Sequence, residues 1–220
     1  MHIVKDVLEI PLMEHFHTVQ GEGFNTGTPA YFLRLGGCDV GCPWCDVKES
    51  WEADKFKSVH IDDMLSFVQQ TTAENAVITG GEPCMYDLEA LTDTFHGAGI
   101  ETWLETSGAY PITGSWHWLC LSPKRWKACL EENYAKADEL KVVIARRQDL
   151  AWAEEHASKV GDECLLFLQP EWDRREEMMP IIVDYIKYEN ETNWENQSFW
   201  EFNGRHALHV IDCESPHCFG

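Results

Sequence analysis

The segment PAYFLRLGGCDVGCPWC (residues 29–45) joins an apolar run to a glycine-rich loop that carries Cys38, Cys42 and Cys45. The run PAYFLRL has the composition of a buried strand. Thiolates are soft ligands, and three of them within eight residues can grip one face of an iron–sulfur cubane and leave one iron without a protein ligand. The alternative is a zinc site that a distant histidine or cysteine completes. The spacing C-x3-C-x2-C favours the cluster over zinc.

Other segments repeat the pattern of a short apolar run followed by a helical one. We predict strands at residues 29–35, 75–79, 100–106, 117–122, 139–144 and 164–169. We predict helices at residues 61–70, 87–99, 147–159 and 173–188, the last of them kinked or divided at Pro180. Strands that alternate with helices indicate an α/β fold with a parallel sheet. About six βα units are too few for a complete eight-stranded barrel, so we predict a partial, open βα barrel in a single domain over residues 1–220.

The unusual polar clusters of the sequence follow the predicted strands directly. Cys38 follows the strand that ends at Leu35, and the other clusters are GGEP after Thr79, SGAY after Thr106, SPK after Leu121 and PEW after Gln169. In βα folds the carboxyl ends of parallel strands carry the chemistry. We therefore expect these clusters to converge on one site.

The charge balance and the cysteine content limit the class of protein. The net charge is −21 with a sequence pI near 4.7, and a surface this acidic repels phosphate backbones and argues against tight binding of nucleic acid. No stretch is long and apolar enough to span a bilayer, and the first residues do not resemble a signal peptide, so we expect a cytoplasmic protein. In a reducing compartment, clustered cysteines more often bind metal than form disulfides.

Trp44, directly before Cys45, adds to the cysteine spacing, because C-x3-C-x-aromatic-C recurs in radical S-adenosylmethionine (SAM) enzymes. CDVGCPWC resembles the signature of that superfamily. Its flanks resemble one family within it, the 7-carboxy-7-deazaguanine synthases of the queuosine and deazapurine pathway. The matching segments lie between residues 8 and 188: TVQGEGFNTGTPAYFLRLGGC (18–38), CPWCD (42–46), ITGGEP (78–83), ETSG (105–108), LSPK (121–124), ELKVVI (139–144) and FLQPEW (167–172). Together these ordered motifs are far more specific than any one of them.

The resemblance implies a 4Fe–4S cluster on Cys38, Cys42 and Cys45, with SAM chelated by the open iron. It implies that the reduced cluster splits SAM to a 5′-deoxyadenosyl radical, with no catalytic residue beyond cluster and SAM. It assigns the SAM contacts to a set of residues around this loop: Trp44, Asp46, Gly80, Gly81, Glu82, Ser122, Pro123, Lys124 and Gln169. On its own chemistry, GGEP allows close backbone approach and offers a carboxylate to an amino group. The alternative is a tight turn closed by Pro83.

The family's substrate is 6-carboxy-5,6,7,8-tetrahydropterin. The resemblance implies hydrogen abstraction at the carbon bearing the carboxylate, ring contraction, and loss of ammonia to give 7-carboxy-7-deazaguanine. Arg34 ends an apolar strand beside the cysteine loop and suits the substrate carboxylate, because a guanidinium binds it through two parallel hydrogen bonds. The other residues assigned to the substrate are Val19, Gln20, Gly21, Glu22, Thr79 and His206, with Glu22 accepting from the pterin N–H groups.

Two regions depart from the family's pattern. Val47 stands where many members have a threonine whose hydroxyl helps to hold magnesium, so we predict weak or absent dependence on Mg2+. Asp46, Glu49 and Ser50 are the nearby oxygen donors. The C-terminal segment, residues 190–220, lacks the family's usual closing motif. His206 is the nearest candidate for the histidine of that motif, with His209 and His217 as alternatives.

The resemblance also implies a homodimer and a protein electron donor such as flavodoxin or ferredoxin. Two other functions stay open on the sequence. One is another small radical SAM enzyme, such as an activase that abstracts hydrogen from a partner protein, and the other is a non-enzymatic zinc-binding module. The segment VQGEG (19–23) together with Arg34 favours a small carboxylated heterocycle over a polypeptide loop.

Overall fold

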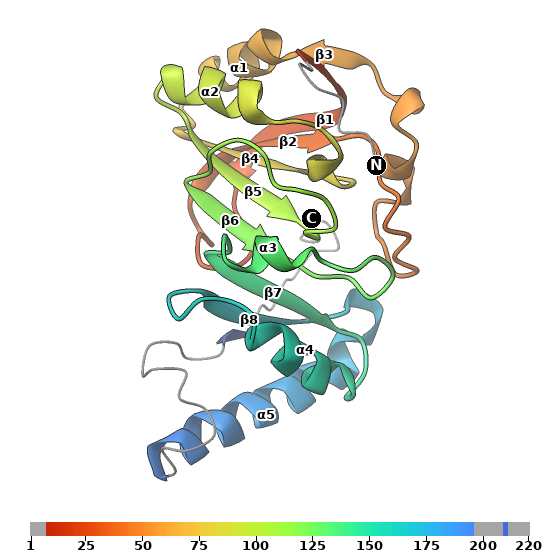
Figure 1. The fold of residues 1–220 in the computed structure, drawn as a ribbon, viewed down its shortest axis with the longest axis vertical. Helices are drawn as coiled ribbons and strands as arrows, with labels where there is room; N and C mark the ends of the chain where they lie inside the picture. The colour runs from red at the N-terminus through yellow and green to blue at the C-terminus, as the bar shows by residue number, and fades with distance from the viewer. Residues whose placement is uncertain (1–7, 196–208, 211–220) are drawn as a thin grey trace.

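One curved sheet organises the part of the chain that the computed structural model describes, residues 8–195 and 209–210 (Figure 1). Within these residues its nine strands lie in the order β3-β1-β2-β4-β5-β6-β7-β8-β9. The strands are β1 (Glu9–Val19), β2 (Pro29–Leu35), β3 (Ser58–His60), β4 (Asn75–Gly80), β5 (Glu101–Thr106), β6 (Trp118–Leu121), β7 (Glu139–Ile144), β8 (Leu165–Pro170) and β9 (His209–Val210). Neighbours from β2 to β9 are parallel, whereas β1 pairs antiparallel with β2 and β3.

Helices cover one face of this sheet (Figure 1). They are α1 (Ile61–Gln69), α2 (Glu89–Gly97), α3 (Glu131–Tyr134), α4 (Asp149–Ala157) and α5 (Arg175–Glu195). The main core lies between helices and sheet, where Leu33 and Leu104 pack with Met64 of α1 and Phe95 of α2, all with no exposed area. Each such side chain stabilises the fold by about 1.5–3 kcal/mol relative to exposure. None of the described helices combines the length and apolarity needed to cross a membrane.

The predicted α/β architecture with a partial barrel is confirmed. The predicted strands correspond to β2 and β4 to β8, and the predicted helices to α1, α2, α4 and α5. The sequence did not indicate β1, because its residues from Glu14 to Val19 are exposed and mix histidines with apolar side chains. An antiparallel strand near the edge of a sheet needs no continuous apolar run, so this strand lacks the pattern of the buried ones.

We expected Pro180 to kink or divide the last helix, and division is wrong, because α5 runs without interruption from Arg175 to Glu195. Proline removes one backbone donor, here the N–H that would bond the carbonyl of Glu176 in the first turn. One missing bond does not end the helix, because Met178 and Ile182 on either side of Pro180 are buried in the core and stabilise this turn by packing.

The alternation of side chains divides the second face of the sheet into two layers. Near the amino ends of the strands, Ala30, Phe32, Val77 and Trp103 form a small apolar cluster. Two residues further along the same strands, the same face carries the polar side chains Arg34, Thr79 and Glu105, which β7 and β8 continue with Lys141 and Gln169. Because side chains alternate with a period of two, an apolar floor therefore underlies a polar layer at the carboxyl ends.

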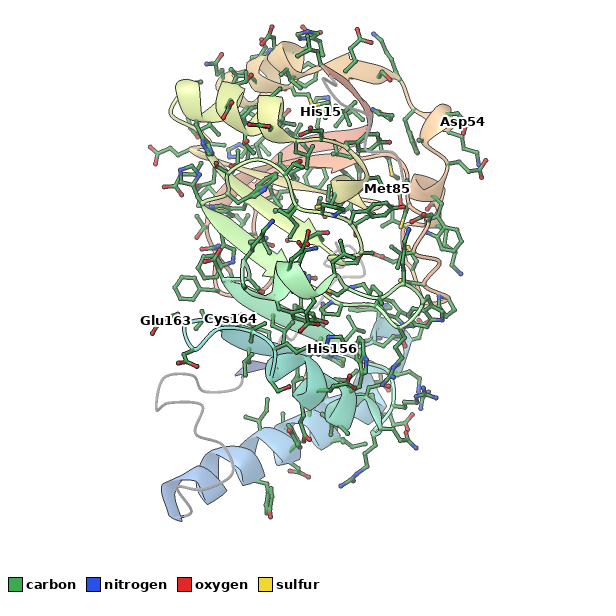
Figure 2. All side chains as sticks on the ribbon, viewed as in Figure 1. His15, Asp54, Met85, His156, Glu163 and Cys164 are labelled. Atoms are coloured by element: carbon green, nitrogen blue, oxygen red, sulfur yellow. The ribbon has the colours of Figure 1, made fainter. Side chains whose placement is uncertain are left out.

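On the face of the sheet that carries the helices, α3 and α4 contact each other through polar and aromatic side chains. The Tyr134 hydroxyl of α3 and Nδ1 of His156 on α4 lie 2.6 Å apart (Figure 2). The ring of Trp152 packs edge-on against His156 with centroids 4.3 Å apart. These helices thus form their own hydrogen-bonded packing away from the polar layer.

Candidate active site

A pocket at the carboxyl ends of the parallel strands gathers most of the segments that the sequence singled out. Of the predicted cluster and SAM residues, Cys38, Cys42, Trp44, Cys45, Asp46, Gly80, Gly81, Glu82, Ser122, Lys124 and Gln169 line it. Pro123 lines an adjoining pocket instead. The lining also includes residues to which the sequence assigned no role: Glu105, Thr106, Ser107, Lys141 and Val143. Loops distant in sequence therefore converge on one space, while the roles of their residues stay predictions.

The cysteine loop is held against the segment that follows it. The Gly37 and Cys38 amides donate to the carbonyls of Ser50 and Trp51 at 2.6 and 3.2 Å. Gly37 has a φ of 105°, a region that favours glycine. None of the three cysteines forms a disulfide. Burial raises the pKa of the Cys38 thiol to about 11, so bound metal charge would be needed to favour the thiolate.

The metal-binding alternatives can be compared with this loop. Among the described residues, no three His, Cys, Asp or Glu side chains are arranged to hold a single metal ion. A mononuclear zinc ion needs such a converging set, so the zinc module has no ready ligand set in this part of the chain. A cubane cluster instead takes one thiolate at each of several irons, and three free thiols on one glycine-rich loop fit it.

The end of β4 crosses the start of the cysteine loop with no room for side chains. A Cβ on Gly80, whose φ is 143°, would lie 2.3 Å from the Leu35 carbonyl oxygen. A Cβ on Gly81 would lie 2.3 Å from the Gly37 carbonyl oxygen and 2.8 Å from Cβ of Cys38. The Glu82 amide donates to the Gly37 carbonyl at 2.8 Å. Glycine is therefore required here for close backbone packing, and this packing brings Glu82 beside the cysteines.

The Glu82 carboxylate is almost fully buried, and four donors from its own chain surround it. Oε1 accepts from the Cys84 amide at 3.1 Å and from the Thr106 hydroxyl at 2.5 Å. Oε2 accepts from the Ser107 amide at 2.9 Å and from the Ser107 hydroxyl. An amino group that binds Glu82 must therefore share its oxygens or displace the Ser107 hydroxyl. The ETSG segment thus orients this carboxylate.

Lys124 and Trp44 lie together on the rim of the pocket. The Lys124 ammonium donates to the Ser122 hydroxyl at 2.5 Å and lies 5.6 Å from the centre of a Trp44 ring. Burial lowers the pKa of Lys124 because desolvation disfavours its charge. Asp46 is exposed at the pocket edge. Lys124 and Trp44 together suit a ligand that combines an anionic group with an aromatic ring.

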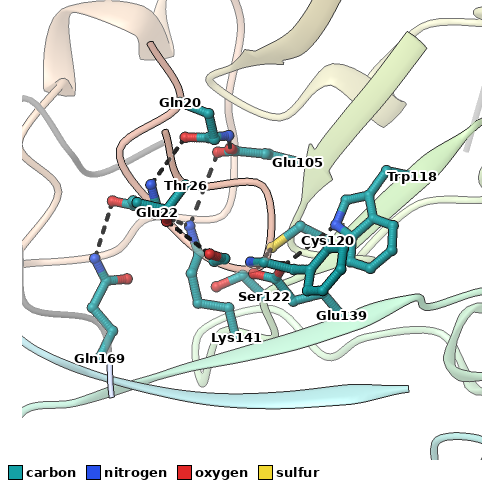
Figure 3. Close-up of polar contacts among 12 residues, drawn as sticks. Gln20, Glu22, Thr26, Glu105, Trp118, Cys120, Ser122, Glu139, Lys141 and Gln169 are labelled. Atoms are coloured by element: carbon teal, nitrogen blue, oxygen red, sulfur yellow. Dashed lines mark hydrogen bonds and ion pairs between the residues drawn. The ribbon is translucent and has the colours of Figure 1, made fainter. Parts of the chain in front are cut away.

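Four of the predicted substrate residues are buried, and they form two groups. Gln20 and Glu22 are buried and contact residues of the polar layer (Figure 3). Gln20 Nε2 donates to Glu105 at 3.0 Å, and Glu22 accepts from Gln169 at 3.1 Å and pairs with Lys141. Val19 and Gly21, in contrast, are exposed. His206 lies outside the described residues, as do Arg205 and His217.

Arg34 and Thr79 form the second group and stand opposite each other on β2 and β4. The Arg34 Nε donates to Glu14 at 2.7 Å, and the Arg34 side chain is only 7% exposed. The hydroxyl of Thr79 is buried and has no hydrogen-bond partner within the described part of the chain. Buried polar atoms are normally paired. The unpaired hydroxyl next to a held guanidinium is therefore consistent with a polar ligand at this position.

The loop of residues 20–28 packs against Glu139 and Trp118, beside the polar layer. The Phe24 amide donates to Glu139 at 3.0 Å, and the Phe24 ring stacks on Trp118 with centroids 5.0 Å apart. A Cβ on Gly23, whose φ is 66°, would meet the Glu139 carboxylate at 2.2 Å. Glu139 therefore fixes the loop that carries Gln20 and Glu22.

Sequence reasoning missed several residues of this site, chiefly Glu105, Ser107, Glu139 and Lys141. A signal was present, because a glutamate and a lysine inside the otherwise apolar runs at 100–106 and 139–144 interrupt a buried strand. Charged residues are rarely buried unless paired. The period of two places Glu139 and Lys141 on the same face.

Comparisons with known proteins were made for both sequence and structure. No family model matches the chain. A "7-carboxy-7-deazaguanine synthase" from Flavobacterium psychrophilum is 50% identical over 84% of this chain and 87% of its own length. Synthases of the same name from Synechocystis and Escherichia coli are 44% and 35% identical over 80% and 74% of this chain, and 84% and 85% of their own lengths. The crystal structure of QueE from Escherichia coli matches with a TM-score of 0.76 and 30% identity, covering 91% of this chain and 93% of that one.

Proposed function

This chain belongs to the 7-carboxy-7-deazaguanine synthase family, and from that premise we propose how its residues carry out the reaction. The protein is a carbon–nitrogen lyase of queuosine biosynthesis that forms 7-carboxy-7-deazaguanine. The observation that carries this conclusion is sequence identity to synthases of that name over most of the chain. Family membership also removes the activase and the zinc module as leading alternatives.

Cys38, Cys42 and Cys45 are proposed to hold a 4Fe–4S cluster, with SAM beside it in the pocket. When bound, this pair supplies a carbon-centred radical that can abstract hydrogen from the substrate. The chain's own part is to place the ligands. Glu82 suits the amino group of SAM, Lys124 and Ser122 suit its polar groups, and Trp44 offers an aromatic face.

Arg34, Thr79, Gln20 and Glu22 are proposed to bind 6-carboxy-5,6,7,8-tetrahydropterin. Because Glu14 takes the Nε of Arg34, the two terminal nitrogens are left for the substrate carboxylate. Glu22 offers carboxylate lone pairs to pterin N–H groups, and Thr79 offers a hydroxyl. The apolar floor under this layer limits water near the reacting carbon, where a radical would attack any available hydrogen.

The remaining partners are proposed from family membership alone. A homodimer and a reducing partner such as flavodoxin or ferredoxin follow from the family. Magnesium is proposed to contribute little, since Val47 lines the pocket and offers no oxygen ligand. Within the described ranges, neither Asp46 nor Glu49 belongs to a group of three or more His, Cys, Asp or Glu side chains that could hold a metal ion.

Product formation tests this proposal. The full chain, reconstituted with iron and sulfide and reduced under anaerobic conditions, is incubated with SAM and 6-carboxy-5,6,7,8-tetrahydropterin, and the product is identified by mass spectrometry. We expect 7-carboxy-7-deazaguanine and equimolar ammonia. Cleavage of SAM without deazaguanine product would contradict the assigned substrate. A Cys42→Ala chain serves as the control and should form no product.

A further inference from the structure

A buried group of charges lies between the strands and the loop of residues 20–28 (Figure 3). The Lys141 ammonium of β7 donates to the Glu22 carboxylate and lies 3.9 Å from Glu105 of β5. The side chains of Lys141, Glu22 and Glu105 are only 2%, 5% and 11% exposed. Charged groups at this depth are retained only when they are paired. The arrangement therefore depends on the Lys141 ammonium, which lies between the two carboxylates.

Neutral side chains complete the group and fix the two carboxylates separately. Gln169 donates to the Glu22 oxygen that Lys141 does not bind, and Gln20 donates to Glu105. Lys141 and Glu105 line the pocket that contains the three cysteines, and they also line a separate pocket together with Glu22 and Gln20. Lys141 thus connects the loop proposed to read the substrate with the sheet that supports the pocket.

The electrostatic surroundings define what Lys141 does to Glu22. Burial raises the pKa of Glu22, Lys141 opposes this shift, and Glu105 adds to it. The other titratable groups that face this position are Glu139 of β7, the Cys120 thiol of β6 and the Lys124 ammonium, which interacts with Lys141 and Cys120. Among the described residues, none of these three forms an ion pair or a hydrogen bond with Glu22. Without Lys141, Glu22 would have no paired cation beside two carboxylates and a thiol, so it would take up a proton at a higher pH than in the unaltered chain.

We propose that Lys141 is a positioning residue for substrate recognition: it holds Glu22 as an oriented carboxylate that can accept hydrogen bonds from the pterin ring. This inference rests on the proposed substrate. It assigns to Lys141 an action through Glu22 and not a contact with the ligand itself. A protonated Glu22 would lose acceptor strength for N–H donors, so the effect of Lys141 should depend on pH.

The first experiment measures binding of 6-carboxypterin, an oxidised form of the proposed substrate, to the full chain with its cluster and SAM but without reductant. Isothermal titration between about pH 6 and about pH 8 gives the ratio of dissociation constants for Lys141→Met and the unaltered chain, which cancels titration of the ligand. We expect Lys141→Met to bind at least about tenfold more weakly near pH 6.5, with the ratio falling as pH rises and Glu22 ionises. Lys136→Met, which removes an exposed lysine bound to the Ile112 carbonyl, should leave the ratio near one.

The second experiment separates positioning from direct contact and does not depend on the folding of Lys141→Met. In the Glu22→Gln chain, the further change Lys141→Met should alter affinity by less than about threefold, because the residue through which Lys141 acts is already gone. The double variant also leaves no unpaired charge at position 22. An additional loss of about tenfold or more in that background would overturn the inference, as would a Lys141→Met ratio that is unchanged or independent of pH.

Failure of the proposed function gives a different result. If the unaltered chain binds neither 6-carboxypterin nor the tetrahydro substrate, the substrate assignment fails and the inference fails with it. If the unaltered chain binds and turns over while the Lys141 variants behave as it does, the function stands and only the inference is overturned.

Discussion

At the scale of single residues, the site depends on buried carboxylates and cations whose partners are fixed by other loops. Glu82 shows this most clearly, because the Thr106 and Ser107 side chains and two amides surround its oxygens. Within the described part of the chain, the hydrogen-bond donors to Glu82 are amides and hydroxyls, and none of them is a cation.

The change Glu82→Gln tests this arrangement. The amide group would point N–H donors at other donors, so we expect a loss of about 1–3 kcal/mol in the free energy of unfolding. We also expect at least about tenfold weaker binding of SAM, because the charge-assisted acceptor is lost. Thermal unfolding and titration with SAM measure the two effects. Glu89→Gln, at an exposed position of α2, is the control, and equal behaviour of the two variants would contradict the role of Glu82.

Arg34 gives a specific prediction, because its Nε binds Glu14 and its two terminal nitrogens are proposed to bind the substrate carboxylate. A lysine cannot serve both Glu14 and a substrate carboxylate with the geometry of the arginine fork. We expect Arg34→Lys to raise the KM for the tetrahydropterin by about tenfold to a hundredfold and to leave SAM affinity unchanged. Arg147→Lys, an exposed arginine, should change neither. Loss of SAM binding in Arg34→Lys would contradict the assignment of Arg34 to the substrate.

Val47 carries the prediction about magnesium. We expect turnover to fall by less than about twofold when a chelator removes Mg2+, since Val47 offers no oxygen ligand. Val47→Thr should make turnover more sensitive to added Mg2+. Initial rates across a magnesium titration provide the measurement, and near-complete loss of turnover in the unaltered chain without Mg2+ would show this prediction to be wrong.

At the scale of elements, the crossing of β4 over the cysteine loop is the contact on which the site's geometry depends. Gly80→Ala adds a Cβ within 2.3 Å of backbone at a positive φ. We expect a loss of at least about 2 kcal/mol in the free energy of unfolding and a lower iron content after reconstitution. Gly97→Ala in α2 is the matched control, because no atom lies within 4 Å of the added Cβ and alanine favours the helix by about 1 kcal/mol. Normal iron content in a folded Gly80→Ala chain would contradict this account.

Much of the fold could be predicted from sequence at this scale, for a physical reason. The buried parallel strands have apolar runs that no solvent-exposed strand needs, so β2 and β7 lie where the sequence indicated. β1 has no such run, since its second half is exposed. The continuity of α5 through Pro180 could not be predicted, because the core packing of Met178 and Ile182, which offsets the cost of the proline, is known only from the fold.

At the scale of the whole molecule, a strongly acidic chain keeps a few cations at its candidate active site. The net charge is −21, yet Lys124 and Lys141 line the pocket, and the buried Arg34 lies in the polar layer of the sheet. The net charge therefore says nothing of the site, which is set by local side chains.

The site itself could be predicted only in part. The cysteine loop and GGEP are local in sequence, so their grouping could be read directly. The pairings of Glu22 with Lys141 and of Glu82 with Ser107 join residues that only the folded sheet brings together. Position in the sheet, and not residue type, decides those partners, and a single sequence does not give the register between strands.

The central claim is that three cysteines hold a cluster with one iron left open to SAM. The most direct measurement is the electron paramagnetic resonance spectrum of the reduced, reconstituted chain with and without SAM, together with iron and sulfide analysis. We predict about four iron and four sulfide atoms per chain and a spectrum that changes when SAM is added. A chain that contains stoichiometric zinc and no iron, or a full cluster whose spectrum is the same with and without SAM, would contradict the claim.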